Sequence, residues 1–164
     1  MPWKTWKTQA VNLLRSSGLG TLIGVLPGVG ANVGSLAAYM TAKRASKTPE
    51  QFGKGSEEGI VASEAANNAT VGGALIPLIA LGVPGSVIGA VLLGALIVHG
   101  LQPGPLLFRQ NPEAVYAIIG SVLVANVMMF ALMLGGARWI ARLSAVPQQV
   151  MMPMITLCCL WGAY

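Results

Sequence analysis

Four long stretches of this sequence contain no charged side chain. They cover residues 16–42, 65–108, 114–137 and 143–164. A helix needs roughly 20 mostly apolar residues to cross a bilayer, so each stretch is long enough for at least one crossing. Soluble domains are about one-quarter charged, whereas only 9% of this chain is charged. The pattern predicts an all-α integral membrane protein with transmembrane helices and argues against a soluble domain.

Glycine and proline interrupt two of these apolar stretches. The run Pro27-Gly28-Val29-Gly30 divides residues 16–42, and a second run at residues 82–85 divides residues 65–108. Because Pro lacks an N–H group and Gly adopts turn conformations, both runs predict broken or re-entrant helices. The first break leaves arms on the order of 12–18 Å long, enough to reach mid-membrane and return. A single kinked span is the alternative.

The charge pattern predicts one partial transmembrane domain. Its expected segments are an interfacial helix (1–15), a broken or re-entrant helix (16–42), a loop (43–64), a helix pair (65–108) broken at 82–85, a transmembrane helix (114–137) and a truncated transmembrane helix (143–164). The first segment places tryptophans on one helical face, as interfacial helices do, although an ordinary lead-in to a span fits equally well. For residues 65–108, a hairpin plus one span and one long discontinuous span both satisfy the positions of the basic residues.

Several classes of function lack support in the sequence. The formal net charge is +5, and basic loops on the cytoplasmic side of a membrane explain it. The basic residues are not interleaved with aromatics, so no nucleic acid partner is expected. A single His and five Glu form no catalytic or metal-binding constellation. We therefore expect neither an enzyme nor a bound cofactor or metal.

Polar side chains at the edge of the second apolar stretch are candidate ligands. Asn67 and Asn68 follow Glu64 where the apolar run begins. Amide oxygens suit Na⁺, and amide NH₂ groups donate to carboxylates. Helix capping or contacts between helices are the alternative role of the amides. For Glu64, a solvated loop carboxylate is the alternative to a cation ligand.

Six motifs in order resemble those of a known family. They are Pro27-Gly28-Val29-Gly30; Tyr39 with Lys43-Arg44; Phe52-Gly53-Lys54-Gly55; Glu64-Ala65-Ala66-Asn67-Asn68; Leu81-Gly82-Val83-Pro84-Gly85; and Gly100-Leu101-Gln102-Pro103-Gly104-Pro105. Together they resemble the second half of the large membrane subunit, TctA, of bacterial tripartite tricarboxylate transporters. The resemblance implies a multi-pass secondary carrier of the bacterial inner membrane that moves a carboxylate such as citrate with a gradient of Na⁺ or H⁺.

The resemblance also implies partners and a larger whole. Tripartite transporters use a periplasmic substrate-binding protein and a small transmembrane subunit. Members of the family are considerably longer and contain two related halves, so this chain is expected to be a fragment that lacks the remainder of the large subunit and is not active alone. A channel-like or scaffold membrane subunit, with no coupled transport cycle, is the alternative function.

The broken helices suggest where substrate binds. Free N–H groups at the start of a helix attract anions. We expect the substrate site to be formed by Gly28, Val29, Gly30, Asn32, Asn67, Asn68, Gly85 and Ser86. Glu64, Asn67 and Asn68 are the expected cation ligands.

Overall fold

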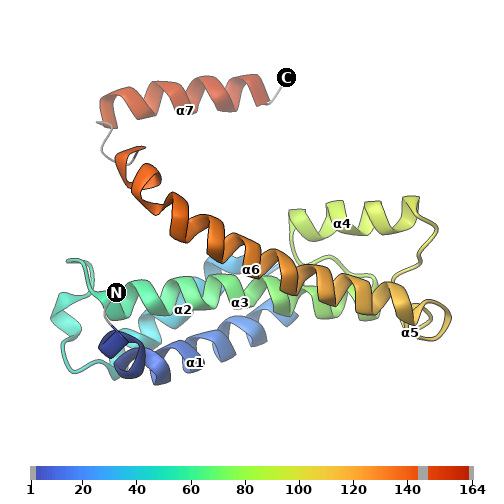
Figure 1. The fold of residues 1–164 in the computed structure, drawn as a ribbon, viewed down its shortest axis with the longest axis horizontal. Helices are drawn as coiled ribbons and strands as arrows, with labels where there is room; N and C mark the ends of the chain where they lie inside the picture. Colours follow the sequence, from blue (N-terminus) through green and yellow to red (C-terminus); the bar gives the residue numbers. More distant parts are fainter. Residues whose placement is uncertain (1–2, 144–147, 163–164) are drawn as a thin grey trace. The chain divides into compact units, whose positions relative to one another are not determined.

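Every regular element of the described chain is a helix (Figure 1). The computed structural model describes residues 3–143 and 148–162. The elements are α1 (Trp3–Val25), α2 (Gly30–Ala45), the 3₁₀ turn η1 (Pro49–Gln51), α3 (Glu57–Leu81), α4 (Val87–Val98), α5 (Leu107–Gln110), α6 (Pro112–Leu143) and α7 (Gln148–Gly162). The all-α prediction is confirmed for these residues. The chain divides into two units, one up to residue 115 and one from residue 116, which are described separately.

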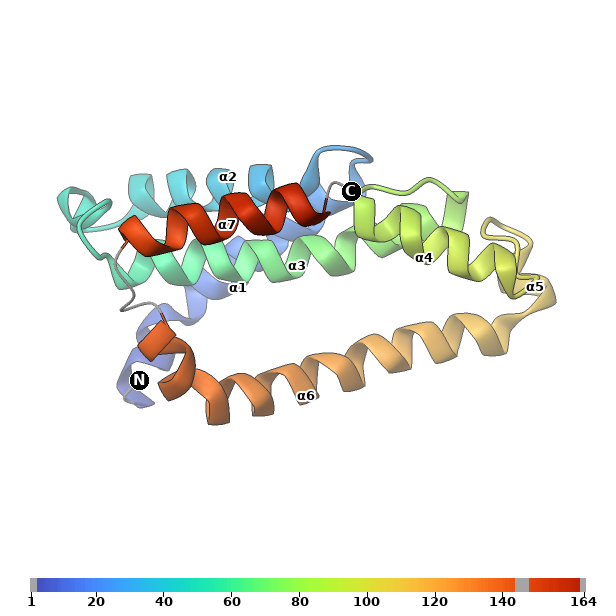
Figure 2. The ribbon, with the colours of Figure 1, turned by 90° about the horizontal axis from the view of Figure 1, so that it is seen from above.

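The first apolar stretch forms two helices joined by a tight turn. Helix α1 ends at Val25, and the Leu26 N–H donates to the Ile23 carbonyl at 3.1 Å. Gly28 and Gly30 have φ angles of 80° and 77°. A side chain at either position would be strained, which explains the two glycines. Helix α2 then runs back beside α1 (Figure 2).

Helices α1 and α3 lie side by side and run in the same direction. The side-chain amide of Asn12 donates to the Glu58 carbonyl at 2.9 Å, across 46 positions of the sequence. The same offset places Gly20 against Ala66 and Gly24 against Thr70. A Cβ at either glycine would overlap the backbone of α3. The absence of side chains therefore sets how closely the two helices approach, as in small-residue packing between membrane helices.

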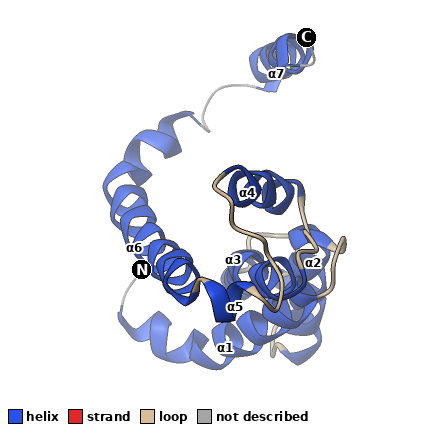
Figure 3. Ribbon diagram, turned by 90° about the vertical axis from the view of Figure 1, so that its right-hand side faces the viewer, coloured by secondary structure: helices blue, strands red, loops and turns tan. Residues whose placement is uncertain are grey.

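Helices α2 and α3 also lie side by side (Figure 3), and small residues form their contact. Ala38 and Ala42 on α2 are buried, and so is Ala62 on α3. Near the end of α2, the Tyr39 and Phe52 rings meet edge to face, with centroids 5.2 Å apart. The residues between α2 and α3 are thereby fixed to the bundle formed by α1, α2 and α3.

Helix α3 ends in a turn that sends the chain back along its own side. The Val83 N–H donates to the Pro77 carbonyl at 3.3 Å and the Gly82 N–H to the Leu78 carbonyl at 3.0 Å. The Gly82 bond is that of the αL capping motif, with Gly82 in the left-handed conformation at φ 70°. Ser86 then begins α4, accepting a hydrogen bond from the Gly89 N–H at 3.1 Å.

One described helix is long and apolar enough to cross a membrane. It covers residues Pro112–Arg142 and corresponds to the transmembrane helix predicted at 114–137. The segment predicted at 143–164 contains α7, whose 15 residues are fewer than a span needs. Residues 144–147 and 163–164 of that segment lie outside the described chain.

Two predicted boundaries differ from the structure. Residues 1–15 were expected to form a separate interfacial helix, but residues from Trp3 onward belong to α1, which continues without a break to Val25. The loop predicted at 43–64 is shorter, because α3 begins at Glu57. Ser56 caps α3 by accepting a hydrogen bond from the Gly59 N–H, and two glutamates in the first turn complement the helix dipole.

Candidate functional site

The two Pro-Gly breaks lie against each other. The extended residues after α3 bring Gly85 beside the turn between α1 and α2. A Cβ placed on Gly85 would lie 3.9 Å from Pro27 Cα and 3.8 Å from the Gly24 carbonyl oxygen. Breaks that are more than fifty residues apart in the sequence therefore form one region of the fold.

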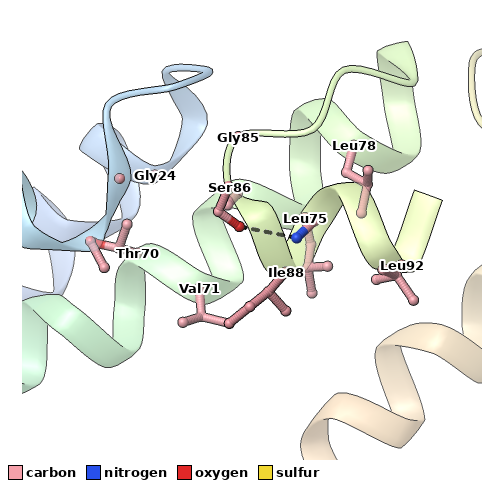
Figure 4. A pocket seen from close by; sticks show the side chains of 13 residues that line it. Gly24, Thr70, Val71, Leu75, Leu78, Gly85, Ser86, Ile88 and Leu92 are labelled. Carbon is pink, nitrogen blue, oxygen red and sulfur yellow. Dashed lines mark hydrogen bonds between the residues drawn. The ribbon is translucent and has the colours of Figure 1, made fainter. Parts of the chain in front are cut away.

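A cavity of about 130 Å³ opens where the breaks meet (Figure 4). Helix α3 forms one wall, and the start of α2, Gly24 of α1 and the start of α4 form the others. The lining residues are Gly24, Gly30, Ala31, Thr70, Val71, Ala74, Leu75, Leu78, Gly85, Ser86, Ile88, Gly89 and Leu92. Most of them are apolar, so a ligand's polar groups must bind mainly to backbone.

Two helix N-termini meet at this cavity. Helix α2 begins at Gly30, and no side chain caps its first turn. Helix α4 begins at Val87, where the Ser86 hydroxyl occupies one N–H group, that of Gly89. The first N–H groups of a helix have no partner within the helix and carry partial positive charge. Residues from the starts of two helices, where N–H groups favour anions, thus contribute to the lining of a mostly apolar cavity.

The structure brings together part of the predicted substrate site. Gly30, Gly85 and Ser86 line the cavity. Gly28 and Val29 belong to the turn immediately before α2 and do not line the cavity. Asn32 lies in the first turn of α2 with its side chain exposed, and it does not line the cavity either.

The predicted cation ligands lie together on an exposed part of α3. Glu64, Asn67 and Asn68 are all exposed, and the Asn68 amide donates to the Glu64 carbonyl at 2.9 Å. Asn67 precedes Val71 by four residues, which places it one helical turn below a cavity-lining residue. These side chains are therefore near the cavity wall but do not line it. Among the described residues, no three His, Cys, Asp or Glu side chains gather as a metal site.

Thr70 is a cavity residue that was not among the predicted site residues. Its hydroxyl donates to the Gly20 carbonyl on α1 at 3.1 Å and lies 2.7 Å from the Ala66 carbonyl on its own helix. It is buried and is, with Ser86, one of two polar side chains in the cavity lining. The signal was present: Thr70 continues a row of small buried residues on α3 at helical spacing.

Comparison with known proteins gives a match over the whole chain. Residues 1–164 match the family model described as "Tripartite tricarboxylate transporter TctA family". An uncharacterised 52.8 kDa protein in the TAR-I ttuC′ 3′ region of Agrobacterium vitis is 35% identical over 152 residues, which are 93% of this chain and 30% of that protein. An uncharacterised protein in the TAR-II ttuC′ 3′ region of the same organism is 35% identical over 145 residues, which are 88% of this chain and 60% of that protein. The chain therefore spans less than two thirds of either relative. No solved structure matches it significantly.

Proposed function

The chain belongs to the tripartite tricarboxylate transporter TctA family, and on this premise we propose that it forms part of a secondary, cation-coupled carrier that takes up a citrate-like carboxylate. The family is a membrane transporter component and not an enzyme. The proposed location is the bacterial inner membrane, with several crossings. The proposed partners are a periplasmic substrate-binding protein, a small transmembrane subunit and the remaining part of the large subunit, without which this chain is inactive.

One observation carries the substrate proposal: two helix N-termini open into a single cavity. Gly30 and Ala31, at the start of α2, line the same cavity as Gly85 and Ser86, which lead into α4. A carboxylate placed there receives backbone hydrogen bonds and gains from both helix dipoles. Broken helices at mid-membrane serve this purpose in other secondary transporters.

We propose a separate role for the exposed group on α3. Glu64, Asn67 and Asn68 present hard oxygen atoms within two turns of one helix, and such atoms suit Na⁺. The Asn68 amide nitrogen is held by the Glu64 carbonyl, which leaves its oxygen able to accept or coordinate. This group completes a cation site only with ligands from other parts of the carrier.

A charge placed in the cavity tests the substrate site. Ala31→Glu adds a carboxylate to the first turn of α2, where a negative charge favours the helix but repels an anionic substrate. Ala31→Gln adds a side chain of the same size without the charge. In the complete carrier with its partners, we expect Ala31→Glu to reduce labelled citrate uptake by about tenfold or more relative to Ala31→Gln.

Two results would contradict the proposal. Equal uptake by the Glu and Gln variants would show that the cavity does not receive the carboxylate. Uptake that persists after the Na⁺ and H⁺ gradients are collapsed would favour the channel-like alternative. Correct insertion of both variants is checked by their level in purified membranes.

A further inference from the structure

A second hollow lies at the opposite end of the bundle from the cavity. It has a volume of about 340 Å³ and is formed by the first half of α1, the end of α2 and the first turn of α3. Its polar lining includes Gln9, Asn12, Arg15, Ser46, Lys47 and Glu58. In contrast to the apolar cavity, this hollow offers charged and amide side chains to a ligand.

Arg15 lacks a full set of partners in this hollow. One terminal nitrogen, Nη2, donates to the Asn12 side-chain oxygen at 2.9 Å. Its Nε is shielded from solvent and has no hydrogen-bond acceptor. Within residues 3–143 and 148–162, the bond to Asn12 is the one polar contact of the guanidinium. A partly buried cation without a counter-ion is unfavourable, and a bound anion would relieve that cost.

Asn12 fixes the position of Arg15. Its side-chain nitrogen donates to the Gln9 side-chain oxygen at 3.0 Å and to the Glu58 carbonyl at 2.9 Å. Its side-chain oxygen is therefore the part turned to the guanidinium. Since α3 holds Asn12 in place, Arg15 is pre-positioned, and a ligand would bind through its terminal nitrogens rather than through the shielded Nε.

We propose that this hollow binds a phosphate group, carried either by an anionic phospholipid or by a soluble phosphate. The guanidinium of Arg15 matches phosphate oxygens with its fork of donors, and Lys47 adds a second positive charge to the same lining. Lys43 and Arg44 lie in the last turn of α2, just before Lys47, and make this end of the bundle basic. Basic residues at a membrane surface attract anionic head groups, so the position suits a lipid as well as a free ion.

The negative charge of Glu58 allows a test in which phosphate binding is expected to become tighter. Glu58 lines the hollow together with the two cations, and its negative charge opposes an anion. The contact that holds Asn12 uses the Glu58 backbone carbonyl, which Glu58→Gln leaves in place. The substitution should therefore tighten phosphate binding without disturbing Arg15, whereas removal of either cation should weaken it.

The experiment compares two phosphate probes on the full chain. The chain is placed in nanodiscs of phosphatidylcholine and titrated with inorganic phosphate by calorimetry. In parallel, nanodiscs with increasing phosphatidylglycerol are analysed by native mass spectrometry for retained lipid. For whichever of the two probes binds, we expect Arg15→Gln to weaken its binding by about tenfold or more. Lys47→Gln should weaken it by severalfold. Arg44→Gln removes the same charge from an exposed position outside the hollow and should have little effect.

The outcomes are distinct. Loss of phosphatidylglycerol retention in the Arg15 and Lys47 variants, with no response to inorganic phosphate, identifies a lipid site, and the reverse identifies a soluble ligand. The proposal is overturned if neither probe binds, or if Arg44→Gln weakens binding as much as Lys47→Gln. Lys47 is exposed, so its variant remains informative should Arg15→Gln fail to fold. Ala31→Glu should leave this binding unchanged, which separates failure here from failure of the substrate site.

Discussion

Thr70 is the residue at which the three helices of the bundle meet. Its hydroxyl reaches the Gly20 carbonyl of α1 at 3.1 Å, and a Cβ on Gly34 of α2 would lie 2.6 Å from that oxygen. Thr70 also lines the cavity. A single buried hydroxyl therefore ties the shape of the candidate substrate site to the packing of the bundle.

Replacing this hydroxyl should destabilise the bundle. Thr70→Val keeps the shape of the side chain and removes the bond to α1, so we expect the free energy of unfolding to fall by about 1–2 kcal/mol. Denaturation in detergent micelles, followed by circular dichroism, measures the change. Thr41→Val is the matched control, because the Thr41 hydroxyl bonds only within its own helix, to the Ala37 carbonyl at 2.8 Å. An equal loss in both variants would show that the contact between helices contributes nothing.

At the scale of the elements, α1 and α3 pack closely because the glycines at their contact have no side chain. Gly20 and Gly24 of α1 face backbone atoms of α3, and Gly73 of α3 faces the Thr21 carbonyl of α1. Backbone atoms cannot move aside as a flexible side chain can. The distance between these helices is therefore sensitive to one added methyl group.

The expected effect of a methyl group depends on the face of the helix. Gly24→Ala should lower the free energy of unfolding by about 1–3 kcal/mol, because its Cβ overlaps the Thr70 backbone. Gly72→Ala, on α3 with nothing within 4 Å of the new Cβ, should raise it by about 0.5–1 kcal/mol, because Ala favours a helix over Gly. The same denaturation assay compares them. A stabilising Gly24→Ala would mean that α1 and α3 are not in contact.

At the scale of the whole molecule, the hairpin of α1 and α2 bears on membrane topology. From Ser16 to Val25, α1 rises roughly 15 Å, about half of the hydrocarbon core. If the basic end near Arg15 and Lys43 lies at the membrane surface, the turn at Pro27 lies near the bilayer centre. This geometry suits the proposed re-entrant segment.

Cysteine labelling tests that placement. Cys158 and Cys159 are first replaced by Ser, and single cysteines are then introduced at Leu26, in the turn, or at Thr48, after α2. In membrane vesicles, we expect Thr48→Cys to react with a membrane-impermeant maleimide from the cytoplasmic side and Leu26→Cys to react slowly from both sides. Rapid labelling of Leu26→Cys from the periplasmic side would mean that α1 crosses the membrane completely.

Features of the fold that depend on local chemistry could be predicted from the sequence. Pro27 and Pro84, with their neighbouring glycines, mark where helices end. Pro lacks an N–H group and Gly permits turn conformations, so their effect on the backbone is local. The contact between Gly85 and Pro27 could not be predicted, since it depends on how far the chain folds back after α3. The start of α3 was missed although Ser56 and the two following glutamates are a local capping signal, because the density of charge around them was interpreted as a loop. The hollow at Arg15 depends on the offset between α1 and α3, which no local pattern specifies.

The offset of 46 residues between α1 and α3 has a consequence for biosynthesis. Helix α1 leaves the ribosome well before the segment that covers its glycine face has been made. At about 5–20 residues per second, the delay is roughly 2–9 s. During that interval the backbone around Gly20 and Gly24 is not yet covered by α3 and can contact lipid or other protein segments. When α3 has been made, it must displace those contacts. Assembly order, as well as final packing, therefore constrains which residues these positions tolerate.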